Sequence, residues 1–424
     1  MEKIFKGFRK NERVDLTNEQ MINFFLYVII FGLPYVYSPY GSDSYYFPKA
    51  IFLWIVGFIL FILFIKEKDY KFNLSSKISI IFGITIFIST IFSLDRIQSL
   101  KGGEMRWEGL ITILVYILLF ILSSKYIRIS KNIIKVFMIL GAIMSVYGIL
   151  QFYGIDSVPR DPFHETLKES YGFIGHRNFF SSYLIILLSI SISTYIFYKK
   201  RSYFIYSLLY FAALISTMTR GGWMTLGVVC FIGLIFILKR KDCIKRAILI
   251  LISFIIIFGV INYTKQGTVL NRFNTIKEDV TDYSDSSGSG RGAIWRASLY
   301  TIKKYPLLGS GPASLWNSFK KDLPEDDGWW WSNGYTIVDR VHNEYLNYAA
   351  TSGIPSMIMY IFIILISMKN MLINIRDDKF KIMFLVILGY SVQAMFNISV
   401  VGVAPIFWII LGIASNPKII KEIN

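Results

Sequence analysis

The sequence is poor in the residues from which metal centres and disulfide frameworks are built. It contains 3 His and 2 Cys in 424 residues, and only 17% of its residues are charged. Cys230 and Cys243 give neither a disulfide framework nor the spacing of a metal site. No P-loop with its Lys-Ser/Thr pair is present, and no haem-ligation pattern. We therefore expect any chemistry of this chain to use no metal, nucleotide or other cofactor.

Long apolar blocks are what the sequence has instead. Hydrophobic residues make up 54% of the chain, and the mean hydropathy is +0.50. The uncharged blocks over 21–37, 51–65, 78–92 and 247–261 are each close to the roughly 20 residues that cross about 30 Å of hydrocarbon as a helix. Uninterrupted apolar runs exclude the alternating pattern of a β-barrel. The sequence predicts an all-α polytopic membrane protein.

About 12 transmembrane helices are predicted, and the basic residues orient them. The spans are expected near 21–38, 49–65, 78–93, 110–123, 134–153, 179–198, 202–219, 222–238, 247–263, 343–367, 382–397 and 402–415. Lys and Arg gather at the termini and in every second connection, which are 66–77, 125–135, 199–201, 239–246 and 369–381. The positive-inside rule makes these segments cytoplasmic, with both termini, in an inner or plasma membrane.

The formal net charge of +17 therefore belongs to one side of the membrane. The cytoplasmic segments hold 27 Lys and Arg against 10 Asp and Glu, and the other side holds 18 against 18. Because these basic residues are short anchors at membrane depth, and no basic groove alternates with stacking aromatics, they indicate membrane lipids as neighbours and exclude nucleic acid as a partner.

Three regions follow from this topology. Residues 1–261 hold helices 1–9, residues 262–342 form a large extracytoplasmic loop, and residues 343–424 hold helices 10–12 and a cytoplasmic tail. Within the loop, residues 282–290 are small and polar and are expected to be flexible. The next segment, 291–304, predicts an amphipathic helix on the membrane surface, with Trp295, Leu299 and Ile302 in one stripe.

The polar residues of the outer side allow two interpretations each. Arg220 either snorkels to the interface or lines a site, and the two glycines after it permit close backbone approach. The run 329–331 of three tryptophans is typical of an interfacial belt, less often of a sugar platform. His164, His176 and His342 all lie on this side, and Asp326 with Asp327 has too few partners for a metal site.

Several outer arginines suit a lipid-linked diphosphate as substrate. A guanidinium group pairs bidentately with phosphate oxygens, and such a substrate carries its own activation. An enzyme without an ATP motif or a metal cluster needs a substrate of this kind.

Three segments, in this order, resemble the O-antigen ligase and polymerase superfamily of bacterial envelope glycosyltransferases. They are Met-Thr-Arg-Gly-Gly-Trp over 218–223, Gly290-Arg291 leading through Trp295 to Tyr-Pro-Leu-Leu-Gly-Ser-Gly over 305–311, and Val-His-Asn-Glu-Tyr-Leu over 341–346 ending in Gly-Ile-Pro over 353–355. Gly-His-Arg-Asn over 175–178 and Arg-Trp-Glu-Gly over 106–109 resemble further family elements. The similarity covers about residues 100–365.

The resemblance implies a GT-C-like membrane glycosyltransferase with its site outside. Such proteins move a glycan from a polyprenyl diphosphate carrier, such as undecaprenyl diphosphate, to a hydroxyl acceptor on a glycan, lipid or protein, with inversion and without a metal. By motif, Arg220 and Arg291 would neutralise the diphosphate, and His342 would orient or deprotonate the acceptor. The remaining residues implied in substrate binding are Asn343, Asn178, Arg177, Arg106 and Trp295.

Three functions share these motifs: ligation to lipid A core, polymerisation of repeat units and transfer onto protein hydroxyl groups. A composition rich in Ile, Lys and Asn favours a low-GC genome and disfavours ligation to lipid A, so a repeat-unit polymerase or a surface polysaccharide ligase is preferred. Protein O-oligosaccharyltransfer is the alternative. A lipid-glycan transporter or flippase is a candidate of another class, although transporters show repeats and broken polar helices that this sequence lacks.

Cysteine labelling tests the predicted sidedness in a chain whose Cys230 and Cys243 have been replaced. Residues near 70, 130, 242 and 378 should be cytoplasmic, and those near 100, 165, 285 and 330 outside. We expect an impermeant maleimide to label Asp285→Cys in intact cells and Asp242→Cys only after lysis. Labelling of 242 without 285 would contradict both the topology and an outer active site.

Overall fold

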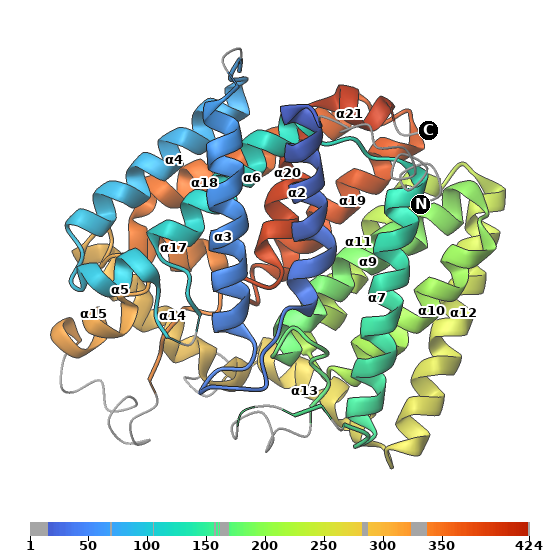
Figure 1. Cartoon of the computed structure of the whole chain (residues 1–424). Coiled ribbons are helices and arrows are strands. Elements are labelled where there is room, and N and C mark those ends of the chain that lie inside the picture. The colour runs from blue at the N-terminus through green and yellow to red at the C-terminus, as the bar shows by residue number, and fades with distance from the viewer. Residues whose placement is uncertain are drawn as a thin grey trace.

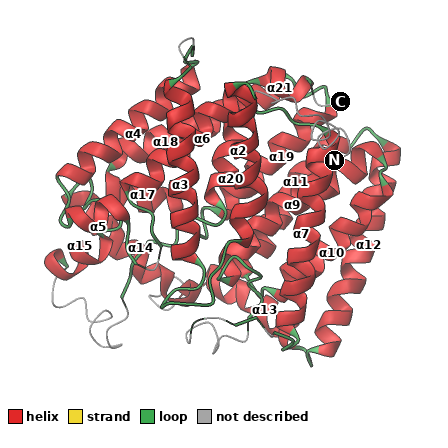
Figure 2. Ribbon diagram, viewed as in Figure 1, coloured by secondary structure: helices red, strands yellow, loops and turns green. Residues whose placement is uncertain are grey.

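The computed structural model describes residues 16–67, 70–104, 106–156, 158–159, 161, 169–281, 287–323 and 337–422. In these residues all regular structure is helical, and Figure 2 shows helices joined by loops without a strand. The helices are α2 (Asn18–Gly32), η2 (Leu33–Tyr35), α3 (Tyr46–Ile65), α4 (Leu74–Ile91), α5 (Arg96–Lys101), α6 (Leu110–Tyr126), α7 (Lys131–Phe152), α9 (Arg177–Tyr198), α10 (Arg201–Ser216), α11 (Arg220–Ile237), α12 (Lys241–Thr264), α13 (Thr268–Thr281), α14 (Ser287–Lys304), α15 (Leu315–Asp322), α17 (Glu344–Ser352), α18 (Ile354–Ile373), α19 (Asp378–Gln393), α20 (Ala404–Ser415) and α21 (Pro417–Lys421).

Every predicted span coincides with helical structure, which confirms an all-helical, multi-pass membrane protein. Among the described residues, seven helices are long and apolar enough to cross a membrane: α3, α4, α7, α9, α11, α12 and α18. The helices at the other predicted spans are shorter, from the 17 residues of α6 down to the 12 of α20. The total of about 12 crossings stays a prediction.

The predicted tenth span, 343–367, is wrong as a single helix, because the chain breaks at Gly353 into α17 and α18. Gly353 has φ of +86°, and a Cβ there would lie 2.1 Å from the carbonyl oxygen of Leu307. Only glycine fits such a close approach in this conformation. Pro355 is tolerated because it lies in the first turn of α18, where its missing N–H is not needed.

The described part of the long loop contains the helices α13, α14 and α15. The helix predicted over 291–304 is confirmed and begins earlier, at Ser287, so the end of the stretch expected to be flexible is helical. The predicted stripe is split, since Trp295 and Ile302 pack against a small core whereas Leu299 is 55% exposed. Because α14 packs through Ile294 and Ala297, the three stripe residues do not form one common membrane face.

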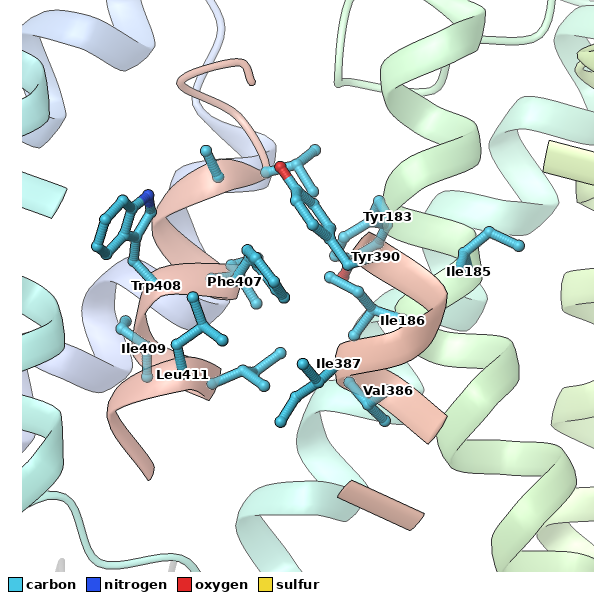
Figure 3. Packing of buried hydrophobic residues seen from close by; sticks show 14 of the residues in the cluster. Tyr183, Ile185, Ile186, Val386, Ile387, Tyr390, Phe407, Trp408, Ile409 and Leu411 are labelled. Carbon is cyan, nitrogen blue, oxygen red and sulfur yellow. The ribbon is translucent and has the colours of Figure 1, made fainter. Parts of the chain in front are cut away.

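Helix α9 lies at the centre of the bundle. Of an apolar stretch of 18 residues in α9, 83% is buried inside the protein, compared with 17% of the corresponding stretch in the peripheral α12. Figure 3 shows the packing of α9 with α19 and α20, in which Tyr390 and Phe407 face each other. Their ring centroids are 3.9 Å apart. Of the seven long apolar helices, α9 therefore has the least contact with the surroundings of the protein.

The basic connections share one end of the bundle. Arg240 pairs with Asp378 at 2.7 Å, joining the connections that precede α12 and α19. Arg128 lies 3.9 Å from Glu422, which brings the connection before α7 to the last described residue. Figure 1 shows α21 at this end and α13 and α14 at the other. The fold thus places these basic connections at one end of the bundle. Their assignment to the cytoplasm stays a prediction.

Small residues allow the closest helix contacts. In α20, a Cβ on Gly412 would lie 2.0 Å from Oγ of Ser123 and 2.4 Å from the carbonyl oxygen of Phe120, both in α6. Close backbone approach at small residues is how membrane helices gain packing energy, since apolar burial alone does not distinguish protein from lipid. Gly412 therefore sets the distance between α6 and α20.

We expect Gly412→Ala to destabilise the protein by about 1–3 kcal/mol, because overpacking forces α20 away from α6. Gly259→Ala is the matched control, since nothing lies within 4 Å of a Cβ at that position of α12. The control should be neutral or slightly stabilising, as alanine favours helix. Thermal unfolding in nanodiscs measures both, and equal midpoints would contradict this account of the contact.

Candidate functional site

The eight predicted site residues gather at the end of the molecule opposite α21. Arg177 and Asn178 open α9, and Arg220 opens α11. The others lie in α14, in the loop before α6, or directly before α17: Arg291, Trp295, Arg106, His342 and Asn343. Because helix N-termini carry partial positive charge, α9 and α11 add to the attraction that this end has for anions.

His342 is the partly buried centre of a charged group formed by Arg106, Arg291 and Asp339. Burial lowers the pKa of His342, the Asp339 carboxylate raises it, and the positive charges of Arg291 and Arg106 lower it again, to about 4. The imidazole is therefore neutral at physiological pH. A neutral ring can accept a proton or a hydrogen bond, as a group that activates a hydroxyl must.

The backbone of His342 is held in an unusual conformation. Its φ is +57°, in the left-handed region that non-glycine residues adopt rarely. The preceding residue, Val341, is fixed from both sides: its carbonyl accepts from Nε1 of Trp295 at 3.1 Å, and its N–H donates to Oδ1 of Asn347 at 3.3 Å. Trp295 therefore positions His342 from α14, a role that its place in the motif did not reveal.

Arg106 is held by a carboxylate and two rings. Its Nε lies 2.8 Å from Oδ2 of Asp339, and its guanidinium stacks 5.5 Å from the ring centre of Tyr46 and 5.2 Å from that of Phe179. These contacts keep the guanidinium next to His342 in a fixed orientation. Arg106 thus joins α3, α9 and the segment before α17.

Asp339 and Arg340, directly before the His-Asn motif, are the site residues that the sequence analysis missed. Burial opposes ionisation of Asp339, but Arg106, Arg340 and His342 together hold its pKa below the usual value. Arg340 is buried, donates to the carbonyl of Glu108 at 3.2 Å and lies 4.0 Å from its carboxylate. Two charged residues beside a candidate catalytic histidine were the signal that could have drawn attention to them.

Arg220 lies in a second polar group. Its Nη1 donates to Oγ1 of Thr275 in α13 at 3.0 Å. The glycines after it serve packing, since a Cβ on Gly221 would lie 2.8 Å from Cβ of Phe396, and one on Gly222 2.3 Å from Oγ of Ser181. The close approach at Gly222 is therefore between α11 and α9, and that at Gly221 is to the turn after α19.

Asn178, in the first turn of α9, joins this helix to the polar group around Arg220. Its Oδ1 accepts from Oγ1 of Thr219 at 3.4 Å, and its carbonyl accepts from Nδ2 of Asn397 at 2.9 Å. The neighbouring Arg177 forms an ion pair with Glu169 at 2.9 Å. Both side chains thus have structural contacts that compete with substrate binding, and their predicted roles stay predictions.

Asn343 is the N-cap of α17, because its Oδ1 accepts from the N–H of Leu346 at 3.1 Å. Such a cap fixes the direction in which the chain leaves His342. His176 caps α9 in the same way, accepting from the N–H of Asn178 at 3.2 Å. His164, Asp326, Asp327 and the tryptophans 329–331 lie outside the described residues.

The Pro-Leu-Leu-Gly-Ser-Gly segment anchors the loop to the membrane helices. The N–H groups of Ser310 and Gly311 donate to the carbonyls of Ala350 and Thr351 at 3.0 and 2.8 Å, at the end of α17. In return the N–H of Ile354 donates to the carbonyl of Pro306 at 2.8 Å. Two motifs of the sequence analysis are therefore partners in one backbone contact.

The positive charge around His342 comes from arginine side chains. In the part of the chain that the structure describes, no three His, Cys, Asp or Glu residues are grouped so that they could hold a metal ion. The arrangement can bind an anion with planar guanidinium groups and present a neutral imidazole beside it.

Comparison with known proteins finds a related family. A family model described as O-antigen ligase matches residues 205–361, which include Arg220, α14 and the His-Asn motif. No match is found among curated proteins. Over this part of the chain, the family match supports the resemblance to the O-antigen ligase/polymerase superfamily.

Proposed function

We propose that the protein transfers a glycan from a polyprenyl diphosphate carrier to a hydroxyl acceptor on the outer side of the membrane. It acts as a repeat-unit polymerase or a surface polysaccharide ligase, with inversion at the anomeric carbon and without a metal. The observation that carries the proposal is a neutral His342 within the field of Arg291 and Arg106. These groups supply an acceptor-activating base beside a cationic site for the leaving group.

The reaction assigns a role to each group. The acceptor oxygen forms a bond to the anomeric carbon while the bond from that carbon to the diphosphate oxygen breaks. The proton of the acceptor moves to the imidazole of His342, and the electron pair leaves with the diphosphate, whose charge Arg291 and Arg220 stabilise. Attack opposite the leaving group gives inversion.

The low pKa of His342 couples donor binding to base strength. With a pKa of about 4 the ring is neutral but weakly basic. A bound diphosphate offsets the positive charge of Arg291 and Arg106, two groups that lower this pKa. The imidazole therefore becomes a stronger base once the donor is in place. Without the donor, its weak basicity restrains proton transfer.

This coupling predicts that the free and the donor-bound enzyme lose activity at different pH values on acidification. The folded-state pKa of His342 lies below its ordinary value of 6.5, so the base form survives acidification down to about pH 4 in the free enzyme. We expect kcat/KM for the donor to fall only near that pH, and kcat, which reports the bound state, to fall at a higher pH. If kcat/KM and kcat both fell near pH 6.5, the proposed environment of His342 would be contradicted.

Arginine and histidine variants separate the two roles. Arg220→Lys and Arg291→Lys should lose a hundred- to thousand-fold in turnover, about 2–4 kcal/mol, because lysine keeps the charge but not the planar fork. His342→Ala should lose turnover while still binding the donor. Arg296→Lys is the matched control, since Arg296 is an exposed residue of the same helix as Arg291.

Donor binding and turnover are measured separately on folded protein, in excess EDTA. Normal turnover by Arg291→Lys would contradict the leaving-group role. Loss of donor affinity in His342→Ala with affinity retained in Arg220→Ala would contradict the division of roles. A strict requirement for Mg²⁺ or Mn²⁺ would contradict the metal-independent mechanism.

The acceptor decides between the polymerase or ligase and the alternative, protein O-oligosaccharyltransfer. Mass analysis of a deletion strain distinguishes them: single repeat units remaining on the lipid carrier support a polymerase. Loss of glycan from surface polysaccharide supports a ligase. Loss from protein hydroxyl groups alone supports the alternative.

A further inference from the structure

A large apolar cleft lies at the basic end, away from the candidate site. It has a volume of about 500 Å³ and is bordered by α2, α7, α9, α10, α19, α20 and α21 and by the connections before α7 and α10. This is within the range of ligand pockets, which is about 300–1,000 Å³. Val386 and Ile409, labelled in Figure 3, belong to its wall.

The lining changes from polar to apolar with depth. Lys131, Lys200 and Lys379 lie where the basic connections meet the helices, and Tyr198 ends α9 beside them. From Tyr198 the wall continues along α9 to Ile190, which is about 12 Å at 1.5 Å per residue. The cleft is thus cationic at its rim and apolar inside, the reverse of the polarity that a water-filled channel needs.

The charged residues known to line the cleft are of one sign. Among the residues that the structure describes, no Asp or Glu lines it. The nearby Asp378 is paired with Arg240 and Lys381, and Nζ of Lys379 donates to the carbonyl of Lys421 at 3.4 Å. Within the described chain, no carboxylate forms an ion pair with Lys131 or Lys200. The rim is complementary to an anion at the depth of lipid headgroups.

We propose that this cleft binds an anionic phospholipid of the surrounding membrane, with its acyl chains along the isoleucine wall and its phosphate at the three lysines. Lysine ammonium groups on flexible stems reach a headgroup phosphate while their stems cover apolar surface. The site lies at the opposite end from His342, so it is distinct from the donor site of the proposed function.

The size of the cleft favours a lipid chain over a small free anion. An apolar cavity of about 150 Å³ already accommodates a benzene ring, and this one is about 500 Å³. A free phosphate would occupy only the rim and leave the isoleucine wall exposed. The apolar wall and the basic rim together fit one amphipathic anion.

Lipid binding is tested on the full chain in nanodiscs of phosphatidylcholine doped with phosphatidylglycerol, by native mass spectrometry of the lipids retained after release. We expect wild type to retain phosphatidylglycerol in preference to phosphatidylcholine. The triple variant Lys131→Gln, Lys200→Gln, Lys379→Gln should lose about fivefold in this preference for each lysine removed. The matched control is Lys241→Gln, Lys245→Gln, Lys418→Gln, three exposed lysines outside the cleft.

A second variant tests the apolar wall independently of charge. Thr194→Phe fills the cleft from α9 and should reduce retention of both lipids, with unfolding monitored to exclude misfolding. Arg291→Lys should bind phosphatidylglycerol as wild type does, which separates this site from the proposed function. Equal lipid preference in the cleft and control triple variants would overturn the proposal, as would displacement of the lipid by inorganic phosphate alone.

Discussion

The site depends on one backbone contact, the pairing of loop 306–311 with the break between α17 and α18. A helix that ends inside a membrane protein leaves carbonyl groups unpaired, which is costly in hydrocarbon. Here the N–H groups of Ser310 and Gly311 satisfy two of them, and Pro306 accepts in return from Ile354. The loop carries α14 with Arg291, and α17 begins beside His342, so the same contact fixes both halves of the charged group.

The charged group is only partly neutralised before any substrate arrives. Asp339 offsets one of the arginines, and the desolvated imidazole stays neutral. Its geometry is held without a ligand by the stacking of Arg106 on Phe179 and by Trp295 on the backbone of Val341. In the proposed reaction, a preorganised arrangement of this kind stabilises the transition state because it does not have to reorganise when charge develops on the leaving group.

Local patterns in the sequence predicted the helices well and the contacts poorly. Spans such as α9 and α12 follow from uncharged apolar runs, which only a helix can place in lipid. The break at Gly353 was missed because its cause, the carbonyl of Leu307, comes from a distant loop. Asp339 was missed for the same reason, as its partner Arg106 lies far away in the chain. The motif residues were named from the family resemblance, and their roles stay predictions: Arg177 and Arg220 open helices, whereas Trp295 lies within α14.

The two ends of the bundle use cations in different ways, and α9 connects them. At the end opposite α21 its first residues meet Arg106 and Thr219, where guanidinium groups are held by rings and carboxylates and present a fixed geometry. At the basic end Tyr198 lies among lysines, whose flexible ammonium groups attract any phosphate without fixing its orientation. The proposed reaction requires the first kind of cation, and the proposed lipid binding requires the second. Because α9 is buried by its neighbours along most of its length, it gives the candidate site a rigid support.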